Sequence, residues 1–374
     1  MNIGINGRVL TERKGGPYRY TVNLIKELAN IDKKNKYYIF VNNNVDFNFY
    51  LPTNFKIIVK STKSKIFFDY VFLPYASHKC YNIDIWIFPK NTFSPMIKGK
   101  TFPIFHDIVY FEKKLKFREF SFFDNLHHTI MIPINSKVST MNIAVSDFTA
   151  QRMHKLLNIP MNKIRVIKEG VEDIFTTAKS KKTLELVKEK YNINLPFFFY
   201  SGSLSPRKNI LNVLNAFDMV KNKLPHNLYL TGGYSWRDKV VHKYIEEKLA
   251  NRVIKLGFVP DEDLVALYNL ADCYLYPSLY EGFGLPILEA QACDCPVITS
   301  TESSCPEIAG EGALLVDPLS VQQIANAMLS IANNTQLKNK IVKAGKKNVR
   351  QYSWRKCAEE MLSLFEEYYT KPRK

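Results

Sequence analysis

The sequence predicts an α/β protein built from two doubly wound halves. Short runs rich in β-branched or aromatic residues alternate with longer amphipathic stretches, an order typical of parallel sheets that helices cover on both faces. The alternation stops in the polar stretch 176–194 and then restarts. The length of 374 residues also suggests two domains, at about 150 residues per domain.

The first domain is expected over residues 1–175. Its opening strand is followed by an amphipathic helix over residues 18–31. The predicted strands are 2–6, 37–41, 55–59, 83–88, 102–106 and 141–146. In the polar stretch that follows this domain, only a short helix is expected.

The second domain is expected over residues 195–350. Helices are predicted over 209–224 and 261–272, and we expect Asp261 to cap the second of them. A long amphipathic helix follows the completed second half, and we expect the C-terminal residues 351–374 to cross back to the first domain. The predicted strands are 197–202, 227–233, 253–259, 273–277, 296–300 and 312–316.

This architecture predicts the place of a ligand site. Open α/β sheets bind ligands beyond the carboxyl ends of their strands. With two such sheets in one chain, we expect the site in a cleft between them.

Charge and cysteine content restrict the classes of function. The net charge of +17 favours anionic partners such as nucleotides, nucleic acid or an acidic membrane surface, although lysines that merely keep the chain soluble are an equal alternative. The chain begins directly on a strand pattern and lacks an apolar run of about 18 residues, so we expect neither a secretory signal nor a membrane span. With no His near Cys293, Cys295 or Cys305, the cysteines predict buried thiols in a reducing cytosol and no metal site.

The stretch EGFGLPILE, residues 281–289, carries more than a core strand and helix need. Its two glycines predict a loop over 281–284, and Pro286 predicts a helix whose first turn holds Glu289. Amides at the positive end of a helix favour an electron-rich ligand, and a carboxylate suits a vicinal diol. A nucleoside diphosphate sugar, bracketed by Glu281 and Glu289, fits this pattern; a tight turn beside a surface glutamate is the alternative.

A second loop, SGSLSPRKN at 201–209, follows a predicted strand and opens a helix. It offers Gly202, Ser203 and the adjacent cations Arg207 and Lys208. Charge-assisted hydrogen bonds from such cations to phosphate are worth about 1.5–3 kcal/mol each. An ordinary surface basic pair is the alternative.

A third loop, RKGGPYRY at 13–20, lies between the first strand and the first helix. Its Gly15–Gly16 pair lets the backbone approach a ligand closely. The loop does not have the glycine spacing of a dinucleotide site.

Together these motifs resemble a family 4 glycosyltransferase of the GT-B fold. YSGSLSPRKNILNVLNAF resembles the family's phosphate loop, and EGFGLPILEAQACDCPVITSTESSCPEIAGEGALLVDP is similar to its Glu-x7-Glu signature and the strand that follows. Gly15–Gly16 and His106–Asp107 stand where the family has a glycine loop and an active-site histidine, and KEGVEDIF (168–175) resembles the segment that leads out of the first domain. Asp294 stands where the family usually has Gly; Asp tolerates the left-handed backbone expected there.

The resemblance implies two Rossmann-like domains that face a central cleft, and a role for each matched residue. Arg207 and Lys208 would neutralise the diphosphate leaving group, and His106 would lie against the transferred sugar. Glu281 would hold hydroxyls of that sugar, and Glu289 would bind the ribose diol. The donor-binding residues that the resemblance implies besides Glu289 are Gly15, Gly16, Gly202, Ser203, Gly282, Phe283, Gly284 and Leu285.

The resemblance also implies a retaining hexosyltransferase that needs neither a metal nor another cofactor. No nucleophile is evident, so we expect front-face attack in which a donor phosphate oxygen takes the acceptor proton. The Pro-Arg-Lys-Asn form of the phosphate loop is similar to members that use GDP-mannose, with UDP-sugars as the second choice. The acceptor is expected to be a saccharide or lipid-linked saccharide in cell-surface glycan synthesis.

Three other functions fit parts of the pattern. A sugar-nucleotide epimerase of the same fold would turn over the donor without an acceptor. A non-catalytic binding protein would hold the nucleotide sugar and transfer nothing, but the intact set Arg207, Lys208, Glu281 and Glu289 argues against it. A nucleic-acid-binding protein would explain the charge, yet the basic residues are scattered and no recognition motif stands out.

The stretch YFEKKLKFREFSFFD, residues 110–124, mixes cations with large aromatic residues. As a helix it would suit an anionic membrane surface, where each cation contributes about 1 kcal/mol. We therefore expect a cytoplasmic enzyme that is peripheral on the inner face of the cell membrane; a helix with buried Phe and solvated Lys is the alternative. The residues concerned are Lys113, Lys114, Lys116 and Arg118 among Phe111, Phe117, Phe120, Phe122 and Phe123.

Overall fold

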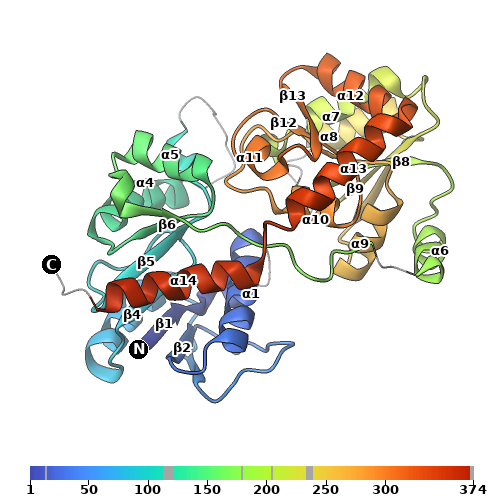
Figure 1. The fold of residues 1–374 in the computed structure, drawn as a ribbon. Helices are drawn as coiled ribbons and strands as arrows, with labels where there is room; N and C mark the ends of the chain where they lie inside the picture. Colours follow the sequence, from blue (N-terminus) through green and yellow to red (C-terminus); the bar gives the residue numbers. More distant parts are fainter. Residues whose placement is uncertain (13–14, 113–120, 178–179, 204, 233–238, 371–374) are drawn as a thin grey trace. The chain divides into compact units, whose positions relative to one another are not determined.

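The computed structural model describes residues 1–12, 15–112, 121–177, 180–203, 205–232 and 239–370. The chain divides into two compact units (Figure 1). Unit 1 contains Met1–Gly170 and Ser353–Lys374, and unit 2 contains Val171–Tyr352.

Unit 1 is built on a seven-stranded sheet in the order β3-β2-β1-β4-β5-β6-β7. All neighbouring strands are parallel, as the alternation of strands and helices predicts. The last strand was not predicted, because its three residues are too few to show a pattern. The strands are β1 (Asn2–Asn6), β2 (Lys36–Val41), β3 (Phe55–Val59), β4 (Ile85–Phe88), β5 (Lys100–Phe105), β6 (Asn142–Ala144) and β7 (Ile164–Val166).

Two helices from opposite ends of the sequence pack against each other in unit 1 (Figure 1). These are α1 (Gly15–Ile31) and α14 (Trp354–Tyr369). Phe102 of β5 meets Phe365 of α14 edge to face, with ring centroids 5.2 Å apart, so the C-terminal helix covers part of this sheet. A helical segment at 65–80 includes α2 (Lys65–Phe67) and α3 (Leu73–Tyr75). Two longer helices follow it, α4 (Phe122–Val138) and α5 (Asp147–Leu157).

Unit 2 is built on a six-stranded parallel sheet in the order β10-β9-β8-β11-β12-β13. Each of the six strands overlaps a predicted one, because each is a compact apolar run bounded by Gly, Pro or polar residues. The strands are β8 (Phe197–Ser201), β9 (Asn227–Thr231), β10 (Val253–Gly257), β11 (Cys273–Tyr276), β12 (Val297–Ser300) and β13 (Ala313–Val316).

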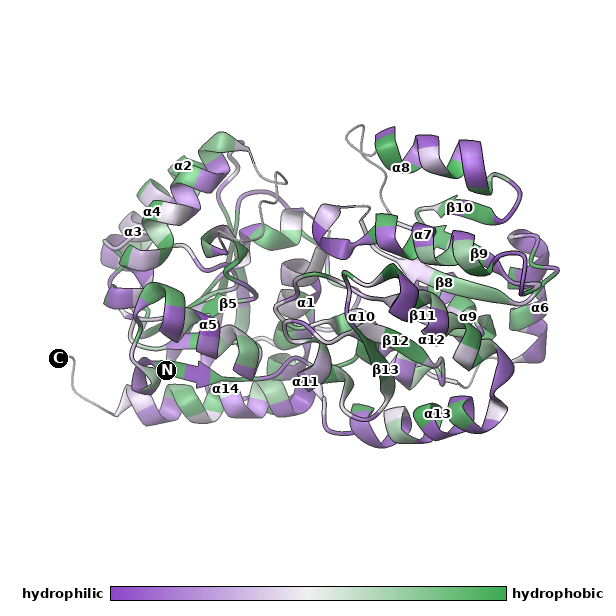
Figure 2. Ribbon diagram, turned by 90° about the horizontal axis from the view of Figure 1, so that it is seen from above, coloured by the Kyte–Doolittle hydropathy of each residue, from purple (hydrophilic) through white to green (hydrophobic). Residues whose placement is uncertain are grey.

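Helices on both faces of the second sheet enclose two apolar cores. One core contains residues of α7 and α12, and the other contains residues of α9 and α10. Figure 2 shows the alternation of polar and apolar residues along the outer helices α13 and α14. The helices are α6 (Lys181–Lys190), α7 (Ile210–Val220), α8 (Lys239–Tyr244), α9 (Asp261–Leu270), α10 (Leu285–Ala292), α11 (Cys305–Ala309), α12 (Val321–Asn333) and α13 (Thr335–Val349).

Both sheets are doubly wound, as predicted, and each reverses its strand order at one point. The reversal lies between β1 and β4 in unit 1, and between β8 and β11 in unit 2. At such a point the loops after the two neighbouring strands lead to opposite sides of the sheet, which leaves room for a ligand.

Two helix starts differ from the prediction. Pro260 is the N-cap of α9 and Asp261 is already its first residue, so the predicted cap was one residue late. Proline has no side-chain acceptor, but an acidic residue in the first turn still favours the helix dipole. Helix α1 begins at Gly15, three residues before the expected start, so Gly15 and Gly16 belong to the helix.

The described part of the chain contains no helix that is both long and apolar enough to cross a lipid bilayer. Residues 113–120, which hold most of the predicted basic and aromatic membrane segment, lie outside the described residues.

Candidate functional site

The candidate site begins with two loops at the point where the strand order of unit 2 reverses. The loop after β8 carries Arg207 and Lys208, and the loop after β11 carries Glu281. Because β8 and β11 are parallel neighbours, both loops leave the sheet at its carboxyl edge.

Hydrogen bonds tie these two loops together. The backbone N–H of Leu279 donates to the carbonyl oxygen of Arg207 at 2.8 Å. The Asn209 side chain donates to the carbonyl oxygen of Pro277 at 2.9 Å, and Asn209 itself takes a left-handed backbone with φ of 62°. Asn is one of the few residues that adopt this conformation readily, which explains its place after the basic pair.

Arg207, Lys208 and Glu281 form a buried ionic cluster. Lys208 Nζ lies 2.6 Å from Glu281 Oε1, and Arg207 Nη1 lies 3.3 Å from Glu281 Oε2. The Glu281 side chain is only 8% exposed and that of Lys208 only 13%. The structure therefore brings Glu281 to an adjacent pair of cations that lie 73 and 74 positions before it in the sequence.

Burial and charge act in opposite directions on this cluster. Burial alone would raise the pKa of Glu281, but the Lys208 and Arg207 charges lower it below its usual value of 4.5. Burial lowers the pKa of Lys208, while the Glu281 charge opposes that shift. We conclude that the carboxylate is ionised and acts as the counterion of the two cations.

Tyr276, the last residue of β11, supports Lys208 from the sheet. Lys208 Nζ donates to the Tyr276 hydroxyl at 2.5 Å and lies 4.7 Å from the centre of its ring. Burial raises the pKa of Tyr276 far above its usual value, so the phenol stays neutral. Sequence reasoning missed this contact, although Tyr276 stands at the predicted end of its strand.

The glycine loop 281–284 is held from the opposite side by the segment after β12. Ser304 Oγ donates to the carbonyl oxygens of Glu281 and Phe283 at 3.1 and 2.6 Å. The Glu281 N–H donates to Ser303 Oγ at 3.1 Å. These serines belong to the TESSCPE stretch, and sequence reasoning gave them no role.

Helix α10 begins at Leu285, after Gly284 with φ of 111°. The loop and helix were predicted, but Glu289 is the fifth residue of α10 and not part of its first turn. The prediction placed the helix start at Pro286, which would have put the carboxylate nearer the positive helix end. Asp294, just past the helix, has the left-handed backbone that was expected of it, with φ of 57°.

Glu289 lies in a second polar cluster of unit 2. It is 7% exposed, and it accepts a hydrogen bond from Tyr268 of α9 at 3.3 Å. The Tyr268 hydroxyl in turn lies 3.1 Å from Ser201 Oγ, which is 2.9 Å from the Tyr274 hydroxyl. This buried chain of hydroxyls fixes the carboxylate at the carboxyl end of β8; its tyrosines were not predicted as site residues.

Gly202 and Ser203 follow β8 directly. A Cβ built on Gly202, whose φ is 130°, would meet no atom of the described residues within 4 Å, so none of these residues fills the space beside it. The neighbouring position 232 requires glycine, because a Cβ built on Gly232 would lie 2.0 Å from the carbonyl oxygen of Gly202. Ser203 is exposed.

The other predicted residues, Gly15, Gly16 and His106, belong to unit 1. Both glycines are exposed at the start of α1, and a Cβ on Gly16 would meet no described atom within 4 Å. Packing inside the described unit therefore does not require glycine at position 16, which is consistent with the close approach of a ligand.

His106 follows β5 at the carboxyl edge of the first sheet. Its Nδ1 lies 3.0 Å from Glu169 Oε1, and its Nε2 lies 3.0 Å from the carbonyl oxygen of Pro89. Tyr20 of α1 meets the ring edge to face, with centroids 5.0 Å apart. Glu169 stands in the KEGVEDIF stretch, but sequence reasoning did not connect it with His106.

A polar cluster that was not predicted spans the strand-order reversal of unit 1. Arg8 Nε lies 3.0 Å from Asp69, and Arg8 Nη1 lies 3.3 Å from Glu12. Lys90, after β4, lies 3.1 Å from Glu12, which links the segments after β1 and β4. Scattered single charges gave no sequence signal for this cluster, because the four residues come from three separate segments.

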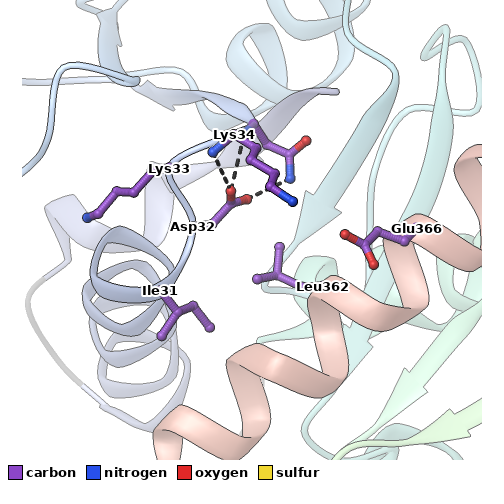
Figure 3. A pocket seen from close by; sticks show the side chains of 7 residues that line it. Ile31, Asp32, Lys33, Lys34, Leu362 and Glu366 are labelled. Carbon is purple, nitrogen blue, oxygen red and sulfur yellow. Dashed lines mark hydrogen bonds between the residues drawn. The ribbon is translucent and has the colours of Figure 1, made fainter.

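Figure 3 shows a pocket of about 260 Å³ at the opposite, amino-terminal edge of the first sheet. Its buried carboxylate, Asp32, already accepts hydrogen bonds from Asn35 Nδ2 at 2.6 Å and the Tyr37 hydroxyl at 2.7 Å. These bonds lower the pKa of Asp32 although burial alone would raise it. The pocket carries none of the predicted site residues. Its lining is Ile31, Asp32, Lys33, Lys34, Asn35, Leu362 and Glu366.

Among the described residues, no group of three or more His, Cys, Asp or Glu side chains is placed to hold a metal ion. Cys293, Cys295 and Cys305 are buried free thiols. Burial raises the pKa of Cys305 to about 12, so this thiol beside the site stays protonated.

The chain is similar in sequence to known glycosyltransferases. Residues 183–348 match the family model described as glycosyl transferases group 1. The chain is 29% identical over 286 residues to O-antigen chain mannosyltransferase B of Escherichia coli. This alignment covers 74% of the chain and 72% of the E. coli protein.

Solved structures of glycosyltransferases share the fold over nearly the whole chain. A glycosyltransferase from Rickettsia africae aligns with a TM-score of 0.76 at 21% identity, covering 99% of both chains. Anabaena Alr3699/HepE in complex with UDP-glucose aligns with a TM-score of 0.76 at 16% identity, covering 98% of this chain and all of that one. Both likenesses confirm the predicted pair of Rossmann-like domains. The chain therefore has the GT-B fold, and its residues 183–348 are similar to the group 1 glycosyl transferases.

Proposed function

We propose that the chain transfers a hexose from a nucleoside diphosphate sugar to a saccharide or lipid-linked saccharide in cell-surface glycan synthesis. GDP-mannose is the first candidate donor and UDP-sugars are the second. The transfer keeps the anomeric configuration and needs no metal. The observation that carries the proposal is the buried cluster of Arg207, Lys208 and Glu281 at the strand-order reversal of unit 2.

In this proposal the two cations bind the diphosphate. Lys208 is largely buried, Arg207 is partly buried, and Glu281 holds both in place. They can therefore stabilise the charge that develops on the leaving group at little reorganisation cost. Glu281 occupies them in the absence of donor and then turns to hydroxyls of the transferred sugar. The space beside Gly202 and the amides of 282–285 accommodate the phosphates.

Glu289 is assigned to the ribose. The hydrogen bond from Tyr268 to Oε2 orients the carboxylate, and a carboxylate is an acceptor that suits a diol. Ser201 and Tyr274 hold Tyr268 in turn. This assignment is separable from that of Glu281, because the two carboxylates have different partners within the unit.

The mannose preference rests on the E. coli mannosyltransferase, and the nucleotide-sugar class is supported by HepE, which was crystallised with UDP-glucose. The resemblance to family 4 implies retention without a metal. Arg207 and Lys208, which can neutralise a diphosphate, support metal independence, and the absence of an evident nucleophile among the predicted residues favours front-face attack. The acceptor hydroxyl would attack from the leaving-group face and pass its proton to a donor phosphate oxygen, while the bond from the anomeric carbon to that leaving group breaks.

The acceptor is assigned to unit 1. The cluster of Arg8, Glu12, Asp69 and Lys90 lies where that sheet reverses its strand order, which is the expected place for a second ligand. Its charged groups are partly exposed and suit the hydroxyls or phosphate of a glycan acceptor.

Peripheral membrane binding is proposed from a surface of unit 1 that adjoins the segment predicted from sequence. Successive turns of α4 expose Phe122, Leu126, Ile130 and Ile134, and Phe123 beside them is 80% exposed. Exposed apolar patches of this extent favour contact with a membrane or a partner.

The helical segment at 65–80 extends this surface. Its Tyr70 hydroxyl lies 2.7 Å from His127 of α4, and Figure 2 shows α2 beside α4. Ile66 and Val71 on that segment are exposed as well. Unit 1 carries 31 Lys and Arg against 16 Asp and Glu, so +15 of the net charge of +17 belongs to it. An anionic lipid surface matches both the apolar residues and this charge.

A donor screen tests the proposed function. The melting temperature is measured with GDP-mannose, GDP-glucose, UDP-glucose, UDP-galactose and the bare nucleotides, all with excess chelator. A donor at 100 times its Kd adds about 2.7 kcal/mol to the free energy of unfolding. The donor that stabilises most is then incubated with mannose-terminated oligosaccharides, and the anomeric configuration of the product is read by NMR.

Transfer with retention in chelator is the expected result. Inversion or an absolute need for a divalent ion would contradict the mechanism. Conversion of the donor sugar without an acceptor would instead identify an epimerase, and binding without turnover would identify a non-catalytic binding protein.

A further inference from the structure

The His106 ring is enclosed by groups that accept hydrogen bonds on both of its nitrogens. Glu169 Oε1 lies 3.0 Å from Nδ1, and the Pro89 carbonyl oxygen lies 3.0 Å from Nε2. A carbonyl oxygen only accepts, so Nε2 must carry a hydrogen to make its contact. One more proton is needed between Nδ1 and the carboxyl group of Glu169.

That second proton belongs on the ring. The Glu169 side chain is only 3% exposed. A buried carboxylate needs a countercharge, and the His106 ring is the group in contact with it. The pair is therefore an imidazolium that donates through both nitrogens, to Glu169 and to Pro89.

Glu169 also stands at a special place in the chain. The next residue, Gly170, is the last residue of unit 1 before the chain enters unit 2. A Cβ on Gly170 would lie 2.1 Å from the backbone nitrogen of Trp354, so the outgoing segment packs directly on the returning one. Trp354 contacts Tyr20 edge to face at 5.5 Å, and Tyr20 contacts His106.

Among the described contacts of the His106 ring, Glu169 is the group that can share a proton with it. Tyr20 of α1 is fully buried, and burial raises its pKa far above the usual value, so its phenol stays neutral. Its hydroxyl lies 3.9 Å from Cys357 Sγ of α14, and burial likewise raises the pKa of that thiol. Glu169 is thus the charged group in direct contact with His106.

We propose that Glu169 is a positioning residue that holds His106 as a fixed imidazolium and ties it to the point where the chain leaves unit 1. The proposal rests on the proposed function in so far as His106 lies against the transferred sugar. With both N–H groups engaged, His106 does not accept the acceptor proton. It supplies positive charge and a rigid wall, so the proton goes to the donor phosphate as proposed above.

The charge of the ring is measured directly by NMR of the full-length, ¹⁵N-labelled protein. Two-bond ¹H–¹⁵N correlation spectra at pH 7 report whether each ring nitrogen carries a proton. The chain has seven histidines, and His106 is identified by the signal that His106→Asn removes. We expect both nitrogens of His106 to be protonated in the wild type and only Nε2 to be protonated in Glu169→Gln. A neutral His106 ring in the wild type overturns the proposal, whether or not the protein shows transferase activity.

The kinetic consequence is measured with three variants. Loss of a carboxylate that orients a functional histidine costs about 10- to 100-fold in activity, so kcat should fall by that factor in Glu169→Gln. The KM for the donor should change by no more than about twofold, because donor contacts remain. Glu169→Asp keeps the charge and should recover part of kcat.

Asp32→Asn is the matched control, because it removes another buried, hydrogen-bonded carboxylate of unit 1. It should leave kcat at the wild-type value. Full kcat in Glu169→Gln, or an equal loss in Asp32→Asn, contradicts the positioning role. If Glu169→Gln does not fold, the wild-type spectrum and Glu169→Asp still decide. A charged ring in a protein that uses no nucleotide sugar refutes the proposed function and leaves the pairing with Glu169 standing.

Discussion

The Nζ atom of Lys208 lies 2.6 Å from Oε1 of Glu281, across the boundary between the loops that follow β8 and β11. Both side chains are largely buried, so the Glu281 carboxylate is the counterion of Lys208, the cation that we propose for the diphosphate. In the proposed function, Glu281 therefore takes the place of a phosphate oxygen until the donor binds. The first four predictions concern this cluster and its neighbour Glu289.

Replacing Lys208 with Ala should lower the rate of sugar transfer by about 10²-fold or more. The ammonium group is a preorganised charge at the leaving group, and loss of one such contact costs this much. Steady-state kinetics with the donor found in the screen provide the measurement. Lys223→Ala, an exposed lysine of the same unit, is the control and should retain full activity. Equal rates in the two variants would show that Lys208 does not contact the leaving group.

Replacing Glu281 with Gln should destabilise the unliganded protein by about 3 kcal/mol, because two largely buried cations lose their counterion. Added GDP should then raise the melting temperature more in this variant than in the wild type, since the diphosphate no longer competes with the carboxylate. Glu302→Gln, at an exposed position after β12, should behave as the wild type. A smaller GDP shift in Glu281→Gln would mean that this carboxylate helps to bind the nucleotide directly.

Replacing Glu289 with Ala should weaken binding of bare GDP by about 10- to 100-fold, the equivalent of losing charged hydrogen bonds worth 1.5–3 kcal/mol. Tyr268→Phe removes only the hydroxyl that orients the carboxylate, so it should weaken binding by less. Isothermal calorimetry compares the two. If Glu289→Ala binds GDP as tightly as the wild type does, Glu289 does not bind the ribose.

Acid should destabilise the protein partly through Glu281. Although burial opposes the shift, Lys208 and Arg207 hold its folded-state pKa below the usual 4.5. The carboxylate therefore stabilises the folded state fully above pH 4.5, and this contribution is lost as the pH falls through the folded-state pKa. Urea unfolding from pH 7 to pH 3 should show a smaller loss of stability in Glu281→Gln than in the wild type. If the free energy of unfolding falls equally with pH in both proteins, the pKa of Glu281 is not lowered in the folded state.

Replacing Phe122 and Phe123 with Ser should abolish binding to vesicles that contain anionic lipid and leave donor affinity unchanged. Both side chains are more than 70% exposed on α4, so they can insert into the lipid headgroup region without unfolding the helix. Co-sedimentation at low and high salt measures this binding. Phe258→Ser removes an 87% exposed phenylalanine from unit 2 and is the matched control. If the wild type does not bind these vesicles at low salt, the membrane proposal is wrong. If the wild type instead forms a dimer and the Phe122→Ser and Phe123→Ser replacements dissociate it, the partner of this surface is a second copy of the chain.

The sequence alone determined both Rossmann-like sheets and much of the site of unit 2. Apolar runs such as FFFYS and CYLY are too short for helices and are bounded by polar or turn residues, so β8 and β11 were predictable from local pattern. Gly284, Asp294 and the basic pair at 207–208 were predictable for the same reason, because backbone conformation and charge are local properties. Strand β7 and the N-cap of α9 were not, since three residues or one proline carry too little pattern.

The tertiary structure alone decided which charged and polar side chains contact one another. Glu281 meets Lys208, His106 meets Glu169, and Glu12 meets Lys90, although 63 to 78 positions separate the members of each pair. No local pattern encodes these partners, because they are set by the order of strands in each sheet, which brings the ends of distant strands side by side. Strand order depends on how the helices cover both faces, so it is a property of the whole unit and not of any one segment.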